Sequence, residues 1–305
     1  MKIKYRLNKG FTLIELMITL VLSLMITYGI AQILISSNRT SVTSDGMSQS
    51  QETGRFVMSF LGKQLHGAGL DSTTDTKLSS GAFISCTDFS DLADNNACIE
   101  ENGGGENQNS ILDAGIHGDR LAIAGVAPLG KLVDCTGATG YVPFIPVGTV
   151  ASTSYKQNDL ILNTFWVEFD DTTNLSNLMC QGFLFNGVDV VGSSSAQAIA
   201  NGVEAMQILY GEANGNLPPT KFRNVSRYVP ASASLDPAAI TINDVKNWNR
   251  VYAVKISIMT RSLTDVANSS SLRRYVLANA EPYDMTDAVS RQVFSTTFVI
   301  NNVPK

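Results

Sequence analysis

A single carboxylate, Glu15, lies inside an apolar run in which it would be unstable alone. The run reads FTLIELMITLVLSLMITYGIAQILI from Phe11 to Ile35, and it contains no lysine or arginine. Inserting a carboxylate into a membrane costs about 2.5 to 3.5 kcal/mol on translocon scales. Because nothing basic in the run can compensate, we expect the partner of Glu15 to be another molecule or a newly made amino terminus. The competing interpretation is that Glu15 simply extends to the lipid headgroups.

The apolar run is long enough to form a membrane-spanning helix. At a rise of 1.5 Å per residue it covers a hydrocarbon core of about 30 Å. Four cations precede it and orient the start of the chain towards the cytoplasm. They are Lys2, Lys4, Arg6 and Lys9. A secretory signal peptide would have a shorter apolar stretch and a small-residue cleavage site, and residues 36–38, Ser-Ser-Asn, make a poor one.

The composition is that of a folded protein that does not bind nucleic acid. The chain has 305 residues, a formal net charge of -5 and an ordinary hydrophobic fraction of 44%. Cleavage after Gly10 would leave 18 of the 22 basic side chains against 27 acidic ones. Nucleic-acid binders pair lysine and arginine with phosphates, so an acidic mature chain argues against that class.

Four cysteines follow the membrane segment, at Cys86, Cys98, Cys135 and Cys180. An even number in an exported domain favours disulfides. Three pairings are possible, of which the order along the chain makes Cys86 with Cys98 and Cys135 with Cys180 the simplest. There is no CxxC pair and there are only two histidines. We therefore expect no metal site and no cofactor.

The elements that position these residues are a long helix and a β-rich head. The helical pattern continues beyond the membrane to about His66, where Gly67 and Gly69 provide a stop. An apolar stripe marks its last turns. The stripe comprises Phe56, Val57, Phe60, Leu61 and Leu65. Gly46 and Gly54 weaken the middle of the helix, so a kink or local melting is expected between residues 44 and 54.

Five later segments have the composition of strands, with branched and aromatic residues in alternation. They are Arg120 to Val126, Leu160 to Phe169, Val203 to Tyr210, Val251 to Met259 and Val293 to Ile300. The fold class expected is α+β, with the long helix packed on a predominantly antiparallel sheet. The polar stretch from Asp71 to Ser110 is expected to be a loop region with acidic side chains that do not match a calcium-binding loop.

An enzyme in the head is not expected. His66 and His117 are the only histidines, and neither a G-x-S-x-G elbow nor a phosphate-binding loop is present. Glu168, Asp170 and Asp171 could act as paired carboxylates, but they have the pattern of a strand that ends in a charged turn. A binding or adhesion module remains a third alternative, since loops carry recognition without a motif.

The basic leader, Gly10, Phe11, Glu15 and the apolar helix together resemble the cleavage signal of type IV prepilins. The resemblance implies that a prepilin peptidase cuts after Gly10 and that Phe11 becomes the N-methylated terminus. It also implies that Glu15 meets the terminal amine of a neighbouring subunit during assembly. A carboxylate and an ammonium buried together would offset each other's desolvation. The implied division is a leader over 1–10, a membrane or filament-core helix over 11–36, an exported helical half over 37–66 and a head over 67–305.

Later segments are similar to the PilW-type minor pilins. They are the stretches over 51–69, 118–126, 201–211, 248–262 and 291–302. This resemblance implies a minor pilin that supports or primes type IV pilus assembly, with other minor and major pilins, the peptidase and the assembly platform as partners. It implies an inner-membrane anchor with a periplasmic head, and a place in the filament or at its tip. The alternative within the superfamily is a minor pseudopilin of a type II secretion system.

Overall fold

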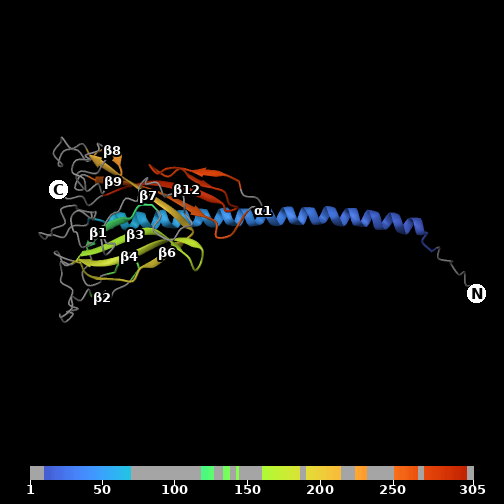
Figure 1. Cartoon of the computed structure of the whole chain (residues 1–305), viewed down its shortest axis with the longest axis horizontal. Helices are drawn as coiled ribbons and strands as arrows, with labels where there is room; N and C mark the ends of the chain where they lie inside the picture. The colour runs from blue at the N-terminus through green and yellow to red at the C-terminus, as the bar shows by residue number, and fades with distance from the viewer. Residues whose placement is uncertain are drawn as a thin grey trace, which may run out of the picture. The chain divides into compact units, whose positions relative to one another are not determined.

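The computed structural model describes residues 10–69, 118–126, 133–137, 142–143, 160–185, 190–213, 224–231, 251–266 and 271–300. The chain divides into two compact units, Met1–Asp45 and Gly46–Lys305. One helix, α1 (Leu13–Gly67), contributes to both, and the strands belong to the second unit (Figure 1). A long N-terminal helix followed by antiparallel sheets confirms the predicted α+β class.

The helix begins and ends close to the predicted residues. It starts at Leu13 rather than Phe11, because Thr12 caps it: the Leu16 N–H donates to the Thr12 carbonyl (3.2 Å). At the other end Gly69 has a φ of 69°, which glycine adopts at little cost. The Gly69 N–H donates to the Ala124 carbonyl (2.9 Å), so the turn after α1 is fixed to a strand.

The first sheet has the strand order β1-β3-β4-β5-β2, with β6 also paired to β4. Every pairing in it is antiparallel. The strands are β1 (Leu121–Val126), β2 (Val142–Pro143), β3 (Leu160–Asp170), β4 (Leu175–Phe185), β5 (Val190–Ser193) and β6 (Gln197–Asn201). β3 ends at Asp170, whose carboxylate accepts hydrogen bonds from the Thr172 N–H and the Thr173 hydroxyl. This confirms the predicted charged turn at that point.

The second sheet has the antiparallel order β12-β9-β7-β8, and a small hairpin pairs β10 with β11. These strands are β7 (Val203–Ala213), β8 (Val225–Val229), β9 (Val251–Arg261), β10 (Arg273–Tyr275), β11 (Tyr283–Met285) and β12 (Arg291–Val299). The alternation of side chains along β9 is typical of a half-buried strand, yet Ser257 on its second face has no exposed surface. The hairpin explains part of this, because Met259 and Tyr283 share one apolar cluster.

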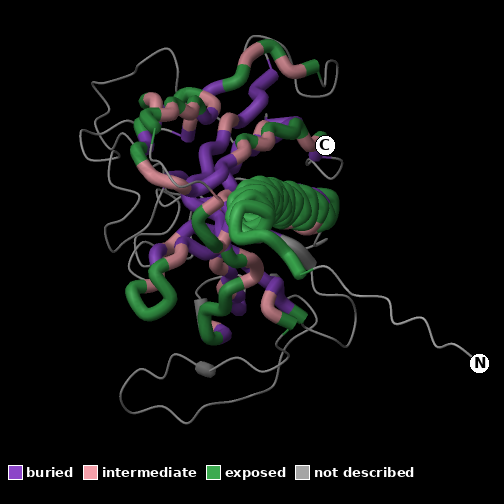
Figure 2. Tube along the Cα trace, turned by 90° about the vertical axis from the view of Figure 1, so that its right-hand side faces the viewer, coloured by how far each residue is buried: buried purple, intermediate pink, exposed green. Residues whose placement is uncertain are grey.

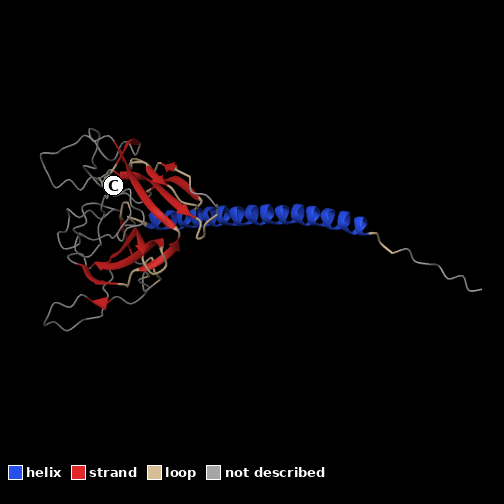
Figure 3. Ribbon diagram, turned by 45° about the vertical axis from the view of Figure 1, so that its right-hand side comes forward, coloured by secondary structure: helices blue, strands red, loops and turns tan. Residues whose placement is uncertain are grey.

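The two sheets lie on either side of the C-terminal half of α1 (Figure 3). One core cluster joins α1 to residues of both sheets. Figure 2 shows the buried segments within the head. Val57, Leu61 and Leu65 are fully buried, as the apolar stripe predicts. Phe56 is an exception: it is 49% exposed and stacks on Phe60 with ring centroids 6.1 Å apart.

Small residues let α1 approach the second sheet closely. A Cβ atom on Gly62 would lie 2.7 Å from the ring of Phe298, and one on Gly54 would overlap the ring of Phe294. One turn before Gly54, the buried Ser50 hydroxyl lies 2.8 Å from the Thr260 hydroxyl on β9. The predicted kink was therefore wrong, because α1 runs without interruption to Gly67. Gly46 and Gly54 are close-approach sites rather than weak points.

The spacing of these contacts sets the register of helix against strand. The eight residue steps along α1 from Gly54 to Gly62 rise about 12 Å. The four residue steps along β12 from Phe294 to Phe298 rise about 13 Å. The contacts thus repeat every eighth residue of α1 and every fourth residue of β12, with both segments running in the same direction.

Candidate functional site: the N-terminal segment of the helix

The predicted cleavage point lies outside the helix. Gly10, Phe11 and Thr12 precede the first helical residue, and all three are exposed, Phe11 to 83%. The Thr12 side chain ends the non-helical segment by capping α1, since its Oγ1 accepts a hydrogen bond from the Glu15 N–H (3.3 Å). The backbone between Gly10 and Phe11 is therefore non-helical and accessible, which is what a peptidase requires of its substrate.

Glu15 occupies the third helical position, where a carboxylate is favoured by the helix dipole. Thr12 and Glu15 have the T-x-x-E spacing of a capping box, in which the threonine side chain satisfies a free N–H of the first turn. The next charged residue along α1 is Arg39, about 36 Å away along the axis. No intrahelical cation can reach Glu15, so its charge is available to another chain.

The rest of the segment presents apolar side chains outwards. Large hydrophobic residues from Leu13 to Ile35 are each between 47% and 79% exposed. Three hydroxyls within it are satisfied internally: Thr19, Ser23 and Thr27 each donate to a carbonyl three or four residues earlier. By length and composition, this part of α1 could cross a membrane.

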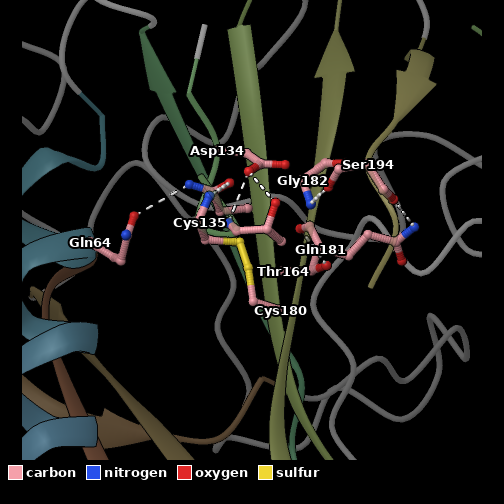
Figure 4. The surroundings of a disulfide bond; sticks show 10 residues. Gln64, Asp134, Cys135, Thr164, Cys180, Gln181, Gly182 and Ser194 are labelled. Atoms are coloured by element: carbon pink, nitrogen blue, oxygen red, sulfur yellow. Dashed lines mark hydrogen bonds between the residues drawn. A yellow bond between two sulfur atoms is a disulfide. The ribbon is translucent and has the colours of Figure 1, made fainter. Parts of the chain in front are cut away.

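In the head, the Cys135–Cys180 disulfide joins residues 133–137 to β4, with Cα atoms 6.3 Å apart. The predicted pairing of these two cysteines is confirmed, whereas Cys86 and Cys98 lie outside the described residues. Figure 4 shows a chain of hydrogen bonds leading from the bridge to α1. The Cys135 N–H donates to the side-chain Oδ1 of Asn163 (3.1 Å), and the side-chain Nδ2 of Asn163 donates to Gln64 Oε1 (3.3 Å).

The carboxylate of Asp134 shapes the other side of this bridge. Its Oδ1 accepts hydrogen bonds from the Thr136 N–H (2.9 Å) and hydroxyl (2.6 Å). A Cβ atom on Gly182 would overlap the Asp134 side chain, so only glycine fits there. The Gly182 N–H in turn donates to the Ser194 hydroxyl (2.9 Å). These contacts hold the segment 133–137 against the first sheet beside the disulfide.

A buried ion cluster fixes the end of the second sheet. Glu204 on β7 is fully buried and bonds through both oxygens to Arg291, with Arg261 3.5 Å away. Asp287 completes the cluster through two 2.6 Å hydrogen bonds from Arg291. Burial would lower the pKa of Arg291, but the hydrogen bonds and charges of Asp287 and Glu204 outweigh burial and raise it. Arg291 therefore stays charged, as a fully buried Glu204 requires.

Of the residues considered for catalysis, the structure describes His66, Glu168, Asp170 and Asp171. His66 lies in the last turn of α1, His117 is outside the described residues, and Glu168 accepts a hydrogen bond from the Trp166 indole (2.8 Å). Among the residues that the structure describes, no group of three His, Cys, Asp or Glu side chains is placed to hold a metal ion.

Sequence reasoning missed the capping role of Thr12, the close packing at the glycines of α1 and the buried ion cluster of Glu204, Arg291 and Asp287. The T-x-x-E spacing could have found the cap. The four-residue spacing of Gly46, Ser50 and Gly54 could have indicated a close-packed face. Nothing local indicates the Glu204–Arg291 pair, because its partners are 87 residues apart.

Comparison with known families covers both ends of the chain. Residues 5–27 match the prokaryotic N-terminal methylation motif. Residues 164–302 match the type IV pilus-assembly protein W family, PilW. No curated protein and no solved structure matches the chain. These families are structural components of pili rather than enzymes. In its N-terminal signal and in its C-terminal half, the chain therefore matches a PilW-type prepilin.

Proposed function

We propose that this chain is a minor pilin whose N-terminal helix is processed, anchored in the inner membrane and then assembled into a type IV pilus. A prepilin peptidase removes residues 1–10, and Phe11 becomes the methylated terminus. Residues 11–36 form the membrane or filament-core helix, and 37–66 extend it into the periplasm. The head over 67–305 contacts other pilins. The PilW match over 164–302 favours a pilus over a secretion pseudopilus.

The observation that carries the proposal is the arrangement around Thr12. On one side of this cap lies an accessible, non-helical Gly10–Phe11 segment. On the other lies Glu15, a carboxylate in an apolar helix whose next charged residue is Arg39. A new terminus at Phe11 would carry an ammonium group four residues before Glu15. Such an ammonium group on a neighbouring subunit would pair with the Glu15 carboxylate and offset the cost of burying it in the membrane.

The test compares two substitutions in the same helix. Glu15→Gln keeps the shape of the side chain and removes its charge, whereas Thr19→Val removes a hydroxyl that is already satisfied within the helix. We expect both variants to be cut after Gly10. Glu15→Gln should be at least about tenfold depleted from sheared filaments, because an unpaired buried ammonium is costly, while Thr19→Val is incorporated normally. Equal incorporation of both variants would contradict the role of Glu15.

A further inference from the structure

The Cys135–Cys180 disulfide holds a segment that has no strand of its own. Residues 133–137 belong to none of the described strands, although they lie beside β4 of the first sheet. The bridge joins this segment covalently to Cys180 on β4. Next to the bridge, the backbone N–H of Cys135 donates to Oδ1 of Asn163 on β3 (3.1 Å). Without the bridge, only non-covalent contacts would keep Cys135 at this position.

The Asn163 side chain connects the bridge to α1. Its Oδ1 faces Cys135, and its Nδ2 donates to Oε1 of Gln64 in the last turns of the helix (3.3 Å; Figure 4). A backbone N–H can only donate a hydrogen bond, so the Cys135 N–H determines which end of the amide faces the bridge. The opposite end, Nδ2, is thereby held towards α1. The position of Cys135 therefore sets the orientation of Asn163 towards Gln64.

Other contacts keep the end of α1 docked on the head. Leu65 is fully buried, and the Gly69 N–H donates to the Ala124 carbonyl after the helix ends. The hydrogen bond between Asn163 and Gln64 adds to these contacts on the side of β3. A hydrogen bond of average strength changes an opening equilibrium roughly fivefold. Its loss would thus loosen the last turns of α1 without detaching the helix from the head.

The bridge forms while the head folds and is then shielded. Cys180 has no exposed surface and Cys135 is 7% exposed, so a reductant in solution does not reach the sulfur atoms of the folded head. To form the bond, the two thiols release two electrons and two protons. These convert a disulfide of an oxidoreductase or of a small-molecule oxidant into two thiols. A chain that folds without such an oxidant lacks the bridge.

We infer that the Cys135–Cys180 bridge is an oxidation-dependent lock on the last turns of α1, transmitted through Asn163. In the oxidised chain Cys135 is fixed, Asn163 is oriented, and Gln64 is held against β3. In a chain with free thiols the hydrogen bond to Gln64 breaks more often, and the last turns of α1 open more often. The inference concerns the folded head alone and depends on no step of the proposed processing or assembly.

Hydrogen–deuterium exchange of the full chain in detergent tests this lock. The amides of residues 61–66 are compared in the wild type, in the double variant Cys135→Ala/Cys180→Ala, in Asn163→Leu and in the triple variant. We expect about fivefold faster exchange in the double variant and in Asn163→Leu, because each weakens or removes the same hydrogen bond. In the triple variant exchange should be no faster than in Asn163→Leu, since the bridge acts through Asn163.

A hydrogen bond on the other side of the bridge provides the matched control. The Ser194 hydroxyl accepts from the Gly182 N–H (2.9 Å), and Ser194 lies on the side of the bridge away from Gln64 (Figure 4). Ser194→Ala should leave exchange at residues 61–66 unchanged. Ile256, which is fully buried in a central strand of the second sheet, reports whether the head is folded. Its amide should stay protected in every variant.

Each of the following results would overturn the lock. Unchanged exchange at residues 61–66 in the double variant would show that the bridge does not act on α1. Faster exchange in the triple variant than in Asn163→Leu would show that the bridge does not act through Asn163. Loss of protection at Ile256 in the double variant would make the bridge a requirement of the whole head rather than a lock on one helix. None of these results affects the proposed function, which is tested by cleavage and by incorporation into filaments.

Discussion

The glycines of α1 offer a sharp test of how the helix packs on the head. A Cβ atom on Gly62 would lie 2.7, 3.2 and 3.4 Å from three atoms of the Phe298 ring. Carbon atoms prefer separations of about 3.5 to 4.0 Å, so the ring must move by roughly 1 Å. Overpacking of this kind costs about 1 to 3 kcal/mol. Replacing a helical glycine by alanine stabilises the helix by up to about 1 kcal/mol, which offsets part of this cost.

We therefore expect Gly62→Ala to lower the free energy of unfolding by up to about 2 kcal/mol, and Gly54→Ala to lower it more because its overlap with Phe294 is deeper. Gly67→Ala is the matched control, since nothing lies within 4 Å of that position. Urea unfolding of the full chain in detergent, followed by near-ultraviolet circular dichroism, gives the values. If Gly54→Ala and Gly62→Ala are as stable as Gly67→Ala, the close approach of α1 to β12 is wrong.

Three further predictions concern the head. Arg291→Met leaves Glu204 buried with only the more distant Arg261, and should cost about 3 to 5 kcal/mol in urea unfolding; a cost below 1 kcal/mol would show that the pair is not needed. Burial tends to raise the pKa of Asp287, but the hydrogen bonds and charge of Arg291 outweigh burial and lower it. The ionised form thus stabilises the head above about pH 4, and this contribution is lost as the pH falls through the lowered pKa. The midpoint temperature of thermal unfolding should accordingly fall less steeply below pH 4 in Asp287→Asn than in the wild type. Parallel plots of this temperature against pH for the two proteins would contradict the assignment. Replacing Cys135 and Cys180 together by alanine opens a link of sequence separation 45, and should cost about 4 kcal/mol by loop-closure entropy, whereas an unchanged urea midpoint would argue against a stabilising bridge.

The parts of the fold with a local signal could be predicted from the sequence. The apolar run, the basic residues before it and the later glycines define the helix to within two residues at either end. Alternation located strands at five segments, although β9 and β7 each extend beyond the predicted ends. The shorter strands, such as β8 and the β10–β11 hairpin, have too few residues for periodicity to stand out.

The remaining features depend on contacts between distant residues. Gly54 has a low helix propensity, and only the ring of Phe294 reveals why glycine is needed there. Likewise, the Phe56 position matches the apolar period, yet its ring is half exposed although the neighbouring Val57 is fully buried. Local propensity describes the element, whereas tertiary packing decides what each position contacts.

The N-terminus of the recovered protein tests the central claim most directly. Mass spectrometry should be applied to the chain from membranes and from sheared filaments of cells with an active prepilin peptidase. We predict a mature chain that begins at N-methylated Phe11 and is present in the filament fraction. A chain that retains Met1 in both fractions would contradict processing and, with it, the assignment of this protein as a pilus subunit.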